Sequence, residues 1–153
     1  MNIFALDIDP QIAASYHCDK HVVKMILESS QMMCTILHEK GINVPYRPTH
    51  RNHPCTKWAA TSRTNFEWLV DLTFWLCVEY RKRYSRTHKC EDVLKFCSNY
   101  KDYLPTGELT SFVQAMPDQY KNEDPIVAYR NYYRIEKARM LQYKNTNRPS
   151  FLD

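Results

Sequence analysis

Residues 9–41, DPQIAASYHCDKHVVKMILESSQMMCTILHEKG, decide the fold of this chain. The segment opens with Asp9-Pro10, a helix N-cap followed by proline at the first helical position. Apolar residues then recur at helical spacing as far as Gly41, which suits a left-handed C-cap. The pattern predicts a long helix from about residue 10 to residue 40, with a possible break near Cys18-Asp19.

The rest of the chain repeats these helical patterns. Asp124-Pro125 is a second Asp-Pro start, and Ser62 can act as an N-cap inside another apolar stretch. Prolines without apolar periodicity predict a loop over 42–54, and 109–120 stays ambiguous. Further helices are expected over 55–85, 92–103 and 125–144, and residues 2–7 are expected to form one short strand or an extended arm.

The length and the composition of the chain fit one folded domain. The chain has 153 residues, 44% of them hydrophobic and 25% charged, which is enough apolar surface for a core and too ordinary a charge content for disorder. We therefore predict a mainly α protein, a compact single-domain helical bundle over residues 1–153.

Several kinds of protein are excluded by what the sequence lacks. Gly41 and Gly107 are its only glycines, so no glycine-rich phosphate loop can form. None of the six cysteines forms a C-x-x-C pair, so we expect no zinc site, no metal and no other cofactor. No signal peptide or membrane-spanning run is apparent. We expect a cytoplasmic protein with reduced thiols.

Polar residues line one edge of the first long helix. At about 100° per residue they fall within an arc of about 100°, and apolar residues fill the other side. One interpretation is a solvated face. The composition favours a cleft, because close cations lower each other's pKa and can make a lysine nucleophilic. The residues of this polar stripe are His17, Lys20, His21, Lys24, Glu28 and Gln31.

The proline-rich loop carries a second polar set, consisting of Arg47, His50, Arg51, Asn52 and His53. If the loop covers the polar stripe, four histidines could meet there. Imidazole is a common metal ligand, but Lys20 and Lys24 would repel a cation, so anion binding or acid–base work is favoured over a metal. The alternative is that His50 and His53 are loop residues hydrogen-bonded locally.

Cations and tyrosines alternate in the last predicted helix. Arg130, Arg134, Lys137 and Lys144 recur at spacings of four, three and seven, which places them on one face of a continuous helix. Such a face neutralises phosphates while aromatic rings stack on bases, so it predicts nucleic-acid binding, with DNA the expected partner. The alternative is an amphipathic helix with its tyrosines packed inward.

Short motifs carry a resemblance. The run HCDKHVVKM (17–25) followed by Asn52-His53-Pro54 is similar to small phage and bacterial proteins. If the protein is encoded by a phage, this resemblance implies that it is located in the cytoplasm of the bacterial host. Asn52-His53-Pro54 together with EYRKRY (79–84) and His88-Lys89 resembles the pyrimidine dimer DNA glycosylases. That family is small, helical and basic, and the resemblance implies excision of damaged pyrimidines by an amine nucleophile and a carboxylate on the first long helix.

The chain departs from that family in two respects. The family uses the amino terminus exposed by removal of methionine, whereas Asn2 should leave Met1 in place. Its carboxylate lies in a differently spaced motif, so Glu28 is an analogue by position. Lys20, Lys24 or Met1 itself would then supply the amine.

We therefore expect a nucleic-acid enzyme of the DNA glycosylase or lyase type. Lys20 or Lys24 would be the nucleophile, Glu28 would stabilise charge or move protons, and His21 and His53 would contact phosphate or act as acid and base. His17 and the loop cations would bind phosphate. Two alternatives remain: a hydrolase or transferase acting on a free nucleotide or nucleotide signal, and a non-catalytic nucleic-acid- or protein-binding viral or host modulator.

Overall fold

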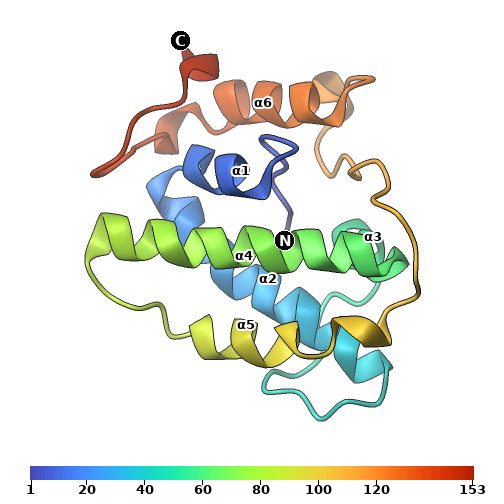
Figure 1. Cartoon of the computed structure of the whole chain (residues 1–153). Helices are drawn as coiled ribbons and strands as arrows, with labels where there is room; N and C mark the ends of the chain where they lie inside the picture. Colours follow the sequence, from blue (N-terminus) through green and yellow to red (C-terminus); the bar gives the residue numbers. More distant parts are fainter.

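The computed structural model covers residues 1–153 and confirms a mainly α, helical bundle (Figure 1). No β-strand is present. The six α-helices are α1 (Pro10–Tyr16), α2 (Asp19–Glu39), α3 (Pro54–Thr61), α4 (Arg63–Tyr84), α5 (Glu91–Ser98) and α6 (Pro125–Glu136). Short 3-10 turns lie between α5 and α6, at Lys101–Tyr103 and Asp118–Tyr120, and after α6, at Ala138–Met140 and Ser150–Leu152.

The helix boundaries follow the capping residues that the sequence indicates. The side chains of Asp9 and Asp124 each accept a hydrogen bond from the backbone two residues on, and Ser62 accepts one from Asn65 N at the start of α4. The first long helix is broken at 17–18, as expected. Beyond α2, Gly41 has a φ of +84°, a conformation that glycine adopts without strain.

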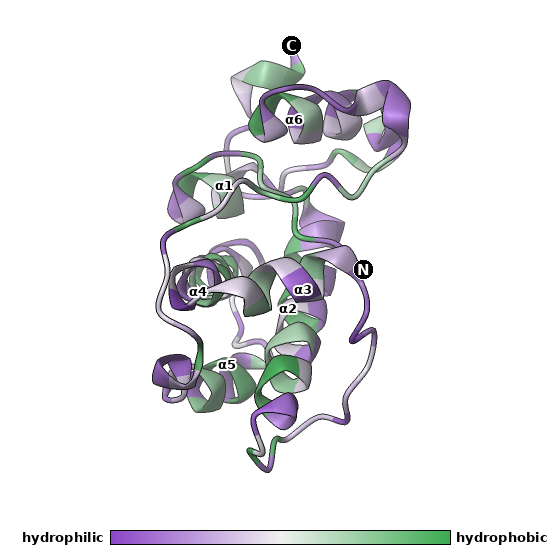
Figure 2. Ribbon diagram, turned by 90° about the vertical axis from the view of Figure 1, so that its right-hand side faces the viewer, coloured by the Kyte–Doolittle hydropathy of each residue, from purple (hydrophilic) through white to green (hydrophobic).

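Helix α4 lies at the centre of the bundle. It packs against α1, α2, α3 and α5, and Figure 2 shows α6 and α1 stacked above this central layer with α5 below it. All six cysteines are free and buried, so they contribute to the core as small apolar side chains. No helix combines the length and the apolar content that crossing a bilayer requires.

Residues 2–6 form a buried arm rather than a strand. The arm packs against α2 and α6, because Phe4 contacts His21 and Tyr133. It is also tied to α6 by Arg130, whose Nε donates to Leu6 O and whose guanidinium pairs with Asp7 at 2.9 Å. Trp68 of α4 donates its indole N–H to Ile8 O. The arm thus holds α6 on the bundle, and the first residue is fixed in place.

The predicted extent of the last helix is wrong. Helix α6 ends at Glu136, not near Lys144. The following residues bond to the junction between α1 and α2 instead: Gln142 O accepts from Asp19 N at 2.8 Å, and Lys144 N donates to the Asp19 carboxylate at 3.0 Å. The Tyr143 hydroxyl donates to Tyr16 O. These tertiary bonds replace the helical ones that local propensity favours.

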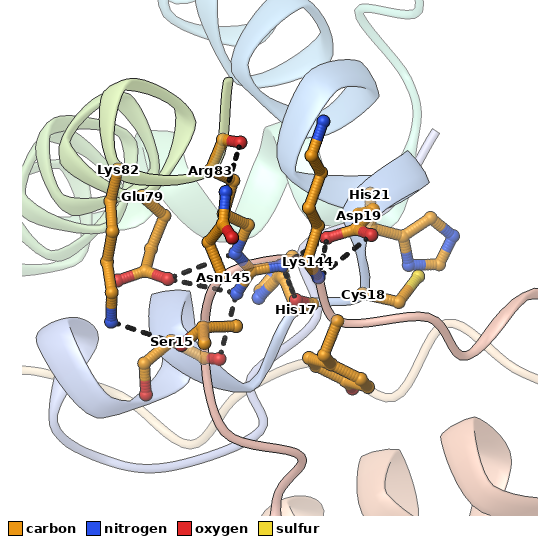
Figure 3. Close-up of polar contacts among 12 residues, drawn as sticks. Ser15, His17, Cys18, Asp19, His21, Glu79, Lys82, Arg83, Lys144 and Asn145 are labelled. Atoms are coloured by element: carbon orange, nitrogen blue, oxygen red, sulfur yellow. Dashed lines mark hydrogen bonds and ion pairs between the residues drawn. The ribbon is translucent and has the colours of Figure 1, made fainter. Parts of the chain in front are cut away.

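The junction between α1 and α2 is held by one buried cation, Arg83, near the end of α4 (Figure 3). Its guanidinium donates to Glu79 Oε1 at 2.9 Å and to Asp19 Oδ1 at 3.2 Å. It also donates to the carbonyls of His17 at 2.6 Å and Ser15 at 3.1 Å. The carbonyls that the helix break leaves free are therefore satisfied from α4.

Replacing Arg83 should destabilise the fold strongly. In Arg83→Met, the buried Glu79 carboxylate, the partly buried Asp19 carboxylate and two carbonyls lose their bonds to Arg83, at a cost of about 3–5 kcal/mol in the free energy of unfolding. The matched control is Arg81→Met on the same helix, since the Arg81 side chain is 52% exposed in its pair with Glu91. That change should cost at most about 1 kcal/mol. Urea unfolding compares the two, and equal losses would contradict this role for Arg83.

Candidate active site

A small pocket lies where the N-terminal arm crosses α2. It is about 120 Å³ in volume, smaller than the roughly 300–1,000 Å³ of typical ligand sites, so it suits one ring or sugar rather than a whole oligonucleotide. We call it the Met1 pocket. Its lining residues are Met1, Asn2, Phe4, His21, Lys24, Met25, Glu28, Tyr132 and Lys137.

Opposite charges meet in the Met1 pocket. The α-ammonium of Met1 lies 3.4 Å from Glu28 Oε1, and Lys24 Nζ lies 3.6 Å from Glu28 Oε2. The Met1 and Glu28 side chains are only 2% and 10% exposed, whereas Lys24 is 64% exposed. Glu28 Oε1 has no hydrogen-bond partner. A largely buried carboxylate with a free acceptor site therefore faces the primary amine of Met1.

The position of the Met1 amine is fixed by Asn2. The Asn2 amide donates to Ala115 O at 2.9 Å, and its oxygen accepts from Ile3 N at 2.8 Å and from the Tyr129 hydroxyl at 3.1 Å. Cys55 lies against the same oxygen, and burial raises the pKa of its thiol to about 11. Cys55 is therefore a neutral packing partner, and Asn2 orients the amine.

Aromatic rings form one wall of the pocket. Phe4 stacks on His21 with ring centroids 4.4 Å apart and lies nearly parallel to Tyr132 at 6.3 Å. Lys137 Nζ lies 5.0 Å from the centre of the Tyr132 ring. The pocket thus combines flat apolar faces with cations at its rim, a combination that suits a nucleotide base and its phosphates.

Two histidines near the pocket are neutral. Burial lowers the pKa of His17 to about 4. Burial also lowers the pKa of His21 to about 3, with further contributions from His17, Lys137 and Lys24. Nδ1 of His21 lies 2.8 Å from the Tyr133 hydroxyl. Near pH 7, His21 can therefore donate or accept a hydrogen bond but carries no charge to attract phosphate.

The structure brings together part of the polar stripe. His21, Lys24 and Glu28 line the Met1 pocket. Lys20 is exposed and lies outside the pocket lining. His17 precedes α2, is fully buried and holds Ala13 O through Nδ1, so it has no open surface for a phosphate.

The proline-rich loop does not roof the stripe as the sequence predicted. It packs along the C-terminal half of α2, where Thr35 bonds to Thr49 and Arg51 pairs with Glu39 at 3.3 Å. The arm and the end of α6 close the pocket instead. The end of the loop approaches the stripe at one point, where His53 lies near Glu28 and the Met1 amine.

The individual loop residues lie in different places. His53 caps α3 through Cys55 N, and burial lowers its pKa, with the Met1 amine adding to the effect and Glu28 opposing it. His53 thus lies close to the charged pair without lining the pocket. His50 bonds to Thr49, and Arg47 is exposed. Arg51 and Asn52 line a separate depression of about 280 Å³ between α2 and α3.

The C-terminal cations do not share one face. Arg130 is committed to Leu6 O and Asp7, and Arg134 is exposed beside Asn131. Lys137 reaches the Met1 pocket, while Lys144 lies beyond the helix over the Tyr84 ring. Tyr129 and Tyr133 are buried, in agreement with the inward-packing alternative. Of this segment, Tyr132 and Lys137 are the residues that face the pocket.

No three metal-ligating side chains converge anywhere in the chain. His50 and His53 stay apart from His17 and His21, so the four-histidine site that the loop would have created does not form. The chemistry available in the Met1 pocket is that of an amine, a carboxylate and a neutral imidazole.

Phe4 was not predicted as a site residue, and Tyr133 was predicted only as one of the tyrosines that alternate with the C-terminal cations. Phe4 is one apolar residue in an apolar run, and Tyr133 is one of eleven tyrosines. Neither position has a pattern that separates a site residue from a core residue. Only the crossing of the arm with α2 and α6 shows that both belong to the site.

Comparison with known proteins agrees with this geometry. The family model for pyrimidine dimer DNA glycosylase matches residues 1–92. The chain belongs to the pyrimidine dimer DNA glycosylase family. No curated protein and no solved structure matches it. The family match spans Met1, His21, Lys24 and Glu28, whereas Tyr132 and Lys137 lie beyond it.

The neutral histidine of this glycosylase-family pocket makes stability depend on pH. His21 has a pKa of about 3 when folded against an ordinary 6.5, so the unfolded chain binds more protons between these values. Its contribution is complete above pH 6.5 and is lost as the pH falls toward 3. By pH 4 the loss should be on the order of a few kcal/mol.

The variant His21→Gln tests this. Removal of the titrating group should flatten the decline in unfolding free energy between pH 6.5 and 4, as measured by urea unfolding. His38→Gln is the control, because His38 is exposed on the same helix. A decline as steep in His21→Gln as in the unmodified protein would refute a neutral buried His21.

Proposed function

We propose that this protein excises damaged pyrimidines from DNA, with the α-amine of Met1 as nucleophile and Glu28 as its proton acceptor. The observation that carries the proposal is the ion pair itself, with the Met1 amine 3.4 Å from a buried carboxylate oxygen that lacks any other partner. Membership of a DNA glycosylase family supports DNA as the substrate.

The reaction follows from these two groups. The neutral amine attacks C1′ of the damaged nucleotide, the bond from C1′ to the pyrimidine nitrogen breaks, and the base leaves with the bonding electrons. Glu28 takes the proton that the amine loses, and the departed base takes a proton from water. As the sugar opens, the C1′–O4′ bond breaks, O4′ takes the proton held by Glu28, and the amine nitrogen forms an iminium with C1′. Loss of a C2′ proton from this iminium then breaks the bond to the 3′ phosphate.

Met1 is favoured over the two lysines as the nucleophile. The Met1 amine lines the pocket and lies 3.4 Å from the oxygen of Glu28 that has no hydrogen-bond partner. Lys24 is largely exposed, and Lys20 lies outside the pocket. Lys24 is better placed, with Lys137, to hold the phosphates on either side of the damaged nucleotide.

Borohydride trapping on DNA that contains an abasic site tests the nucleophile. Reduction should fix the iminium as a stable adduct, and mass spectrometry of the digested complex should place it on the peptide that begins with Met1. The variant Lys24→Gln should still be trapped, whereas one glycine added before Met1 should abolish trapping because it displaces the amine. An adduct on Lys20 or Lys24 would contradict the assignment.

Removal of the carboxylate should slow excision. Glu28→Gln keeps the size of the side chain but cannot accept the amine proton, so the rate on ultraviolet-irradiated DNA should fall by about 10²–10⁴-fold. Glu39→Gln, an exposed change on the same helix, should leave the rate unchanged. If Glu28→Gln retains full activity, Glu28 has no role in proton transfer.

Phosphate contacts should appear in the salt dependence of DNA binding. Lys24→Gln and Lys137→Gln should each weaken binding for all sequences and reduce the slope of log K against log salt by about one. Lys95→Gln on α5, remote from the pocket, is the control. Unchanged slopes, with tight binding of a small phosphorylated ligand, would instead favour the free-nucleotide alternative.

A further inference from the structure

We infer that His21 is a neutral hydrogen-bond donor, locked in one tautomer by Tyr133, that stabilises the departing pyrimidine through its carbonyl oxygen. The inference rests on the proposed function and adds to it a residue that acts on the leaving group. The argument depends on the hydrogen bonds around one phenol.

The Tyr133 hydroxyl has a single proton and two neighbours. Its oxygen accepts from Cys18 N–H at 2.8 Å, and it lies 2.8 Å from His21 Nδ1. The Cys18 N–H can only donate, so the phenolic proton must go elsewhere. The Cys18 thiol is a weak acceptor, whereas an imidazole nitrogen is a strong one. Tyr133 therefore donates to His21 Nδ1.

The opposite arrangement would leave a buried proton without a partner. If Nδ1–H donated to the phenol, the hydroxyl proton of Tyr133 would have no acceptor of comparable strength, and Tyr133 is completely buried. An unsatisfied buried donor costs about 1–3 kcal/mol. The arrangement with a bare Nδ1 therefore dominates, and the ring proton of neutral His21 must be on Nε2.

Nε2 of His21 has no hydrogen-bond partner in the protein and is not fully enclosed. His21 as a whole is 4% exposed, and Nε2 retains part of that accessible surface. The accessible surface that His21 borders is the Met1 pocket. Stacking on Phe4 at 4.4 Å fixes the plane of the ring. An N–H donor of fixed direction thus points into the pocket.

The His21 N–H donor can stabilise the negative charge that excision creates on the departing pyrimidine. As the bond to C1′ breaks, the electron pair left on the pyrimidine nitrogen is shared with the adjacent carbonyl oxygen. A hydrogen bond to that oxygen is stronger in the transition state than before it, which is the condition for catalysis. His21 donates without transferring its proton, so it needs no partner to reprotonate it.

Burial first, and neighbouring cations after it, keep the donor neutral. The charged and titratable groups around His21 are Lys24 and His17 on its own side of the bundle, Tyr133 and Lys137 from α6 and the turn after it, and Met1 and Glu28 across the pocket. The cations among them disfavour a second positive charge. Lys137 and Tyr133 both lie beyond the residues that the family model matches, so this device depends on the C-terminal segment of this chain.

The test compares two variants on two substrates. His21→Leu removes the donor, and His21→Gln keeps an amide N–H near the position of Nε2. On irradiated DNA, His21→Leu should lower the excision rate by roughly 100-fold and His21→Gln by less than about tenfold. On DNA with a preformed abasic site, from which no base departs, both variants should cleave the strand within about threefold of the unmodified protein.

The comparison separates the role in base departure from a structural one. Equal losses on both substrates, or no loss in His21→Leu, would overturn the inference. Failure of the proposed function is distinguishable, because the unmodified protein would then form no adduct with abasic DNA.

A separate measurement tests whether Tyr133 determines which nitrogen of His21 carries the ring proton. Long-range ¹H–¹⁵N spectra of the free protein at pH 7 should show His21 as the single Nε2–H tautomer. Tyr133→Phe should give a mixture of tautomers and lower the excision rate by about three- to tenfold, again without affecting cleavage at abasic sites. A single Nε2–H tautomer in Tyr133→Phe, or the Nδ1–H tautomer in the unmodified protein, would show that Tyr133 does not set the proton.

Discussion

The Arg83 guanidinium holds the arrangement on which the rest of the molecule depends. It is buried at the junction of α1 and α2, where it donates to two carboxylates and to two carbonyls that the helix break leaves free. Because Arg83 sits near the end of α4, it fixes the angle at which α2 leaves this junction. The side chains of His21 and Glu28 are placed by that angle, so a structural ion pair remote from the chemistry determines the geometry of the pocket.

The N-terminal arm contributes the second constraint. A chain end is usually poorly ordered, yet Asn2 is held by Ala115 and Tyr129, and residues 3–6 are buried. An ion pair at 3.4 Å with a largely buried carboxylate is weak support for stability, because the carboxylate loses hydration. The proposed chemistry gives the pair a role, since an amine beside a proton acceptor is what nucleophilic attack requires.

Much of the fold could be predicted from the sequence because its signals are local. Asp9, Ser62 and Asp124 cap their helices through bonds to residues two or three positions away, and a helix break near Cys18 follows from the same local pattern. The end of α6 could not be predicted, because the bonds that replace its last turns reach back to Asp19. The same limit applies to the site. Periodicity on α2 selects Lys24 and Glu28, but the partners that close the pocket come from distant parts of the chain.

The residues of the pocket therefore come from two separate segments of the chain. The amine and the carboxylate belong to the segment that the glycosylase family shares, while Tyr132, Tyr133 and Lys137 come from a segment outside the match. Groups that make and break bonds tolerate little displacement, whereas groups that bind the base and its phosphates can differ with the lesion. The hydroxyl of Tyr133 joins the two segments, because it bonds to Cys18 and His21. It thereby connects α6 to α2, the helix that carries Glu28. If the proposed chemistry holds, a change in α6 would alter which pyrimidine is recognised without moving the proposed nucleophile, the Met1 amine.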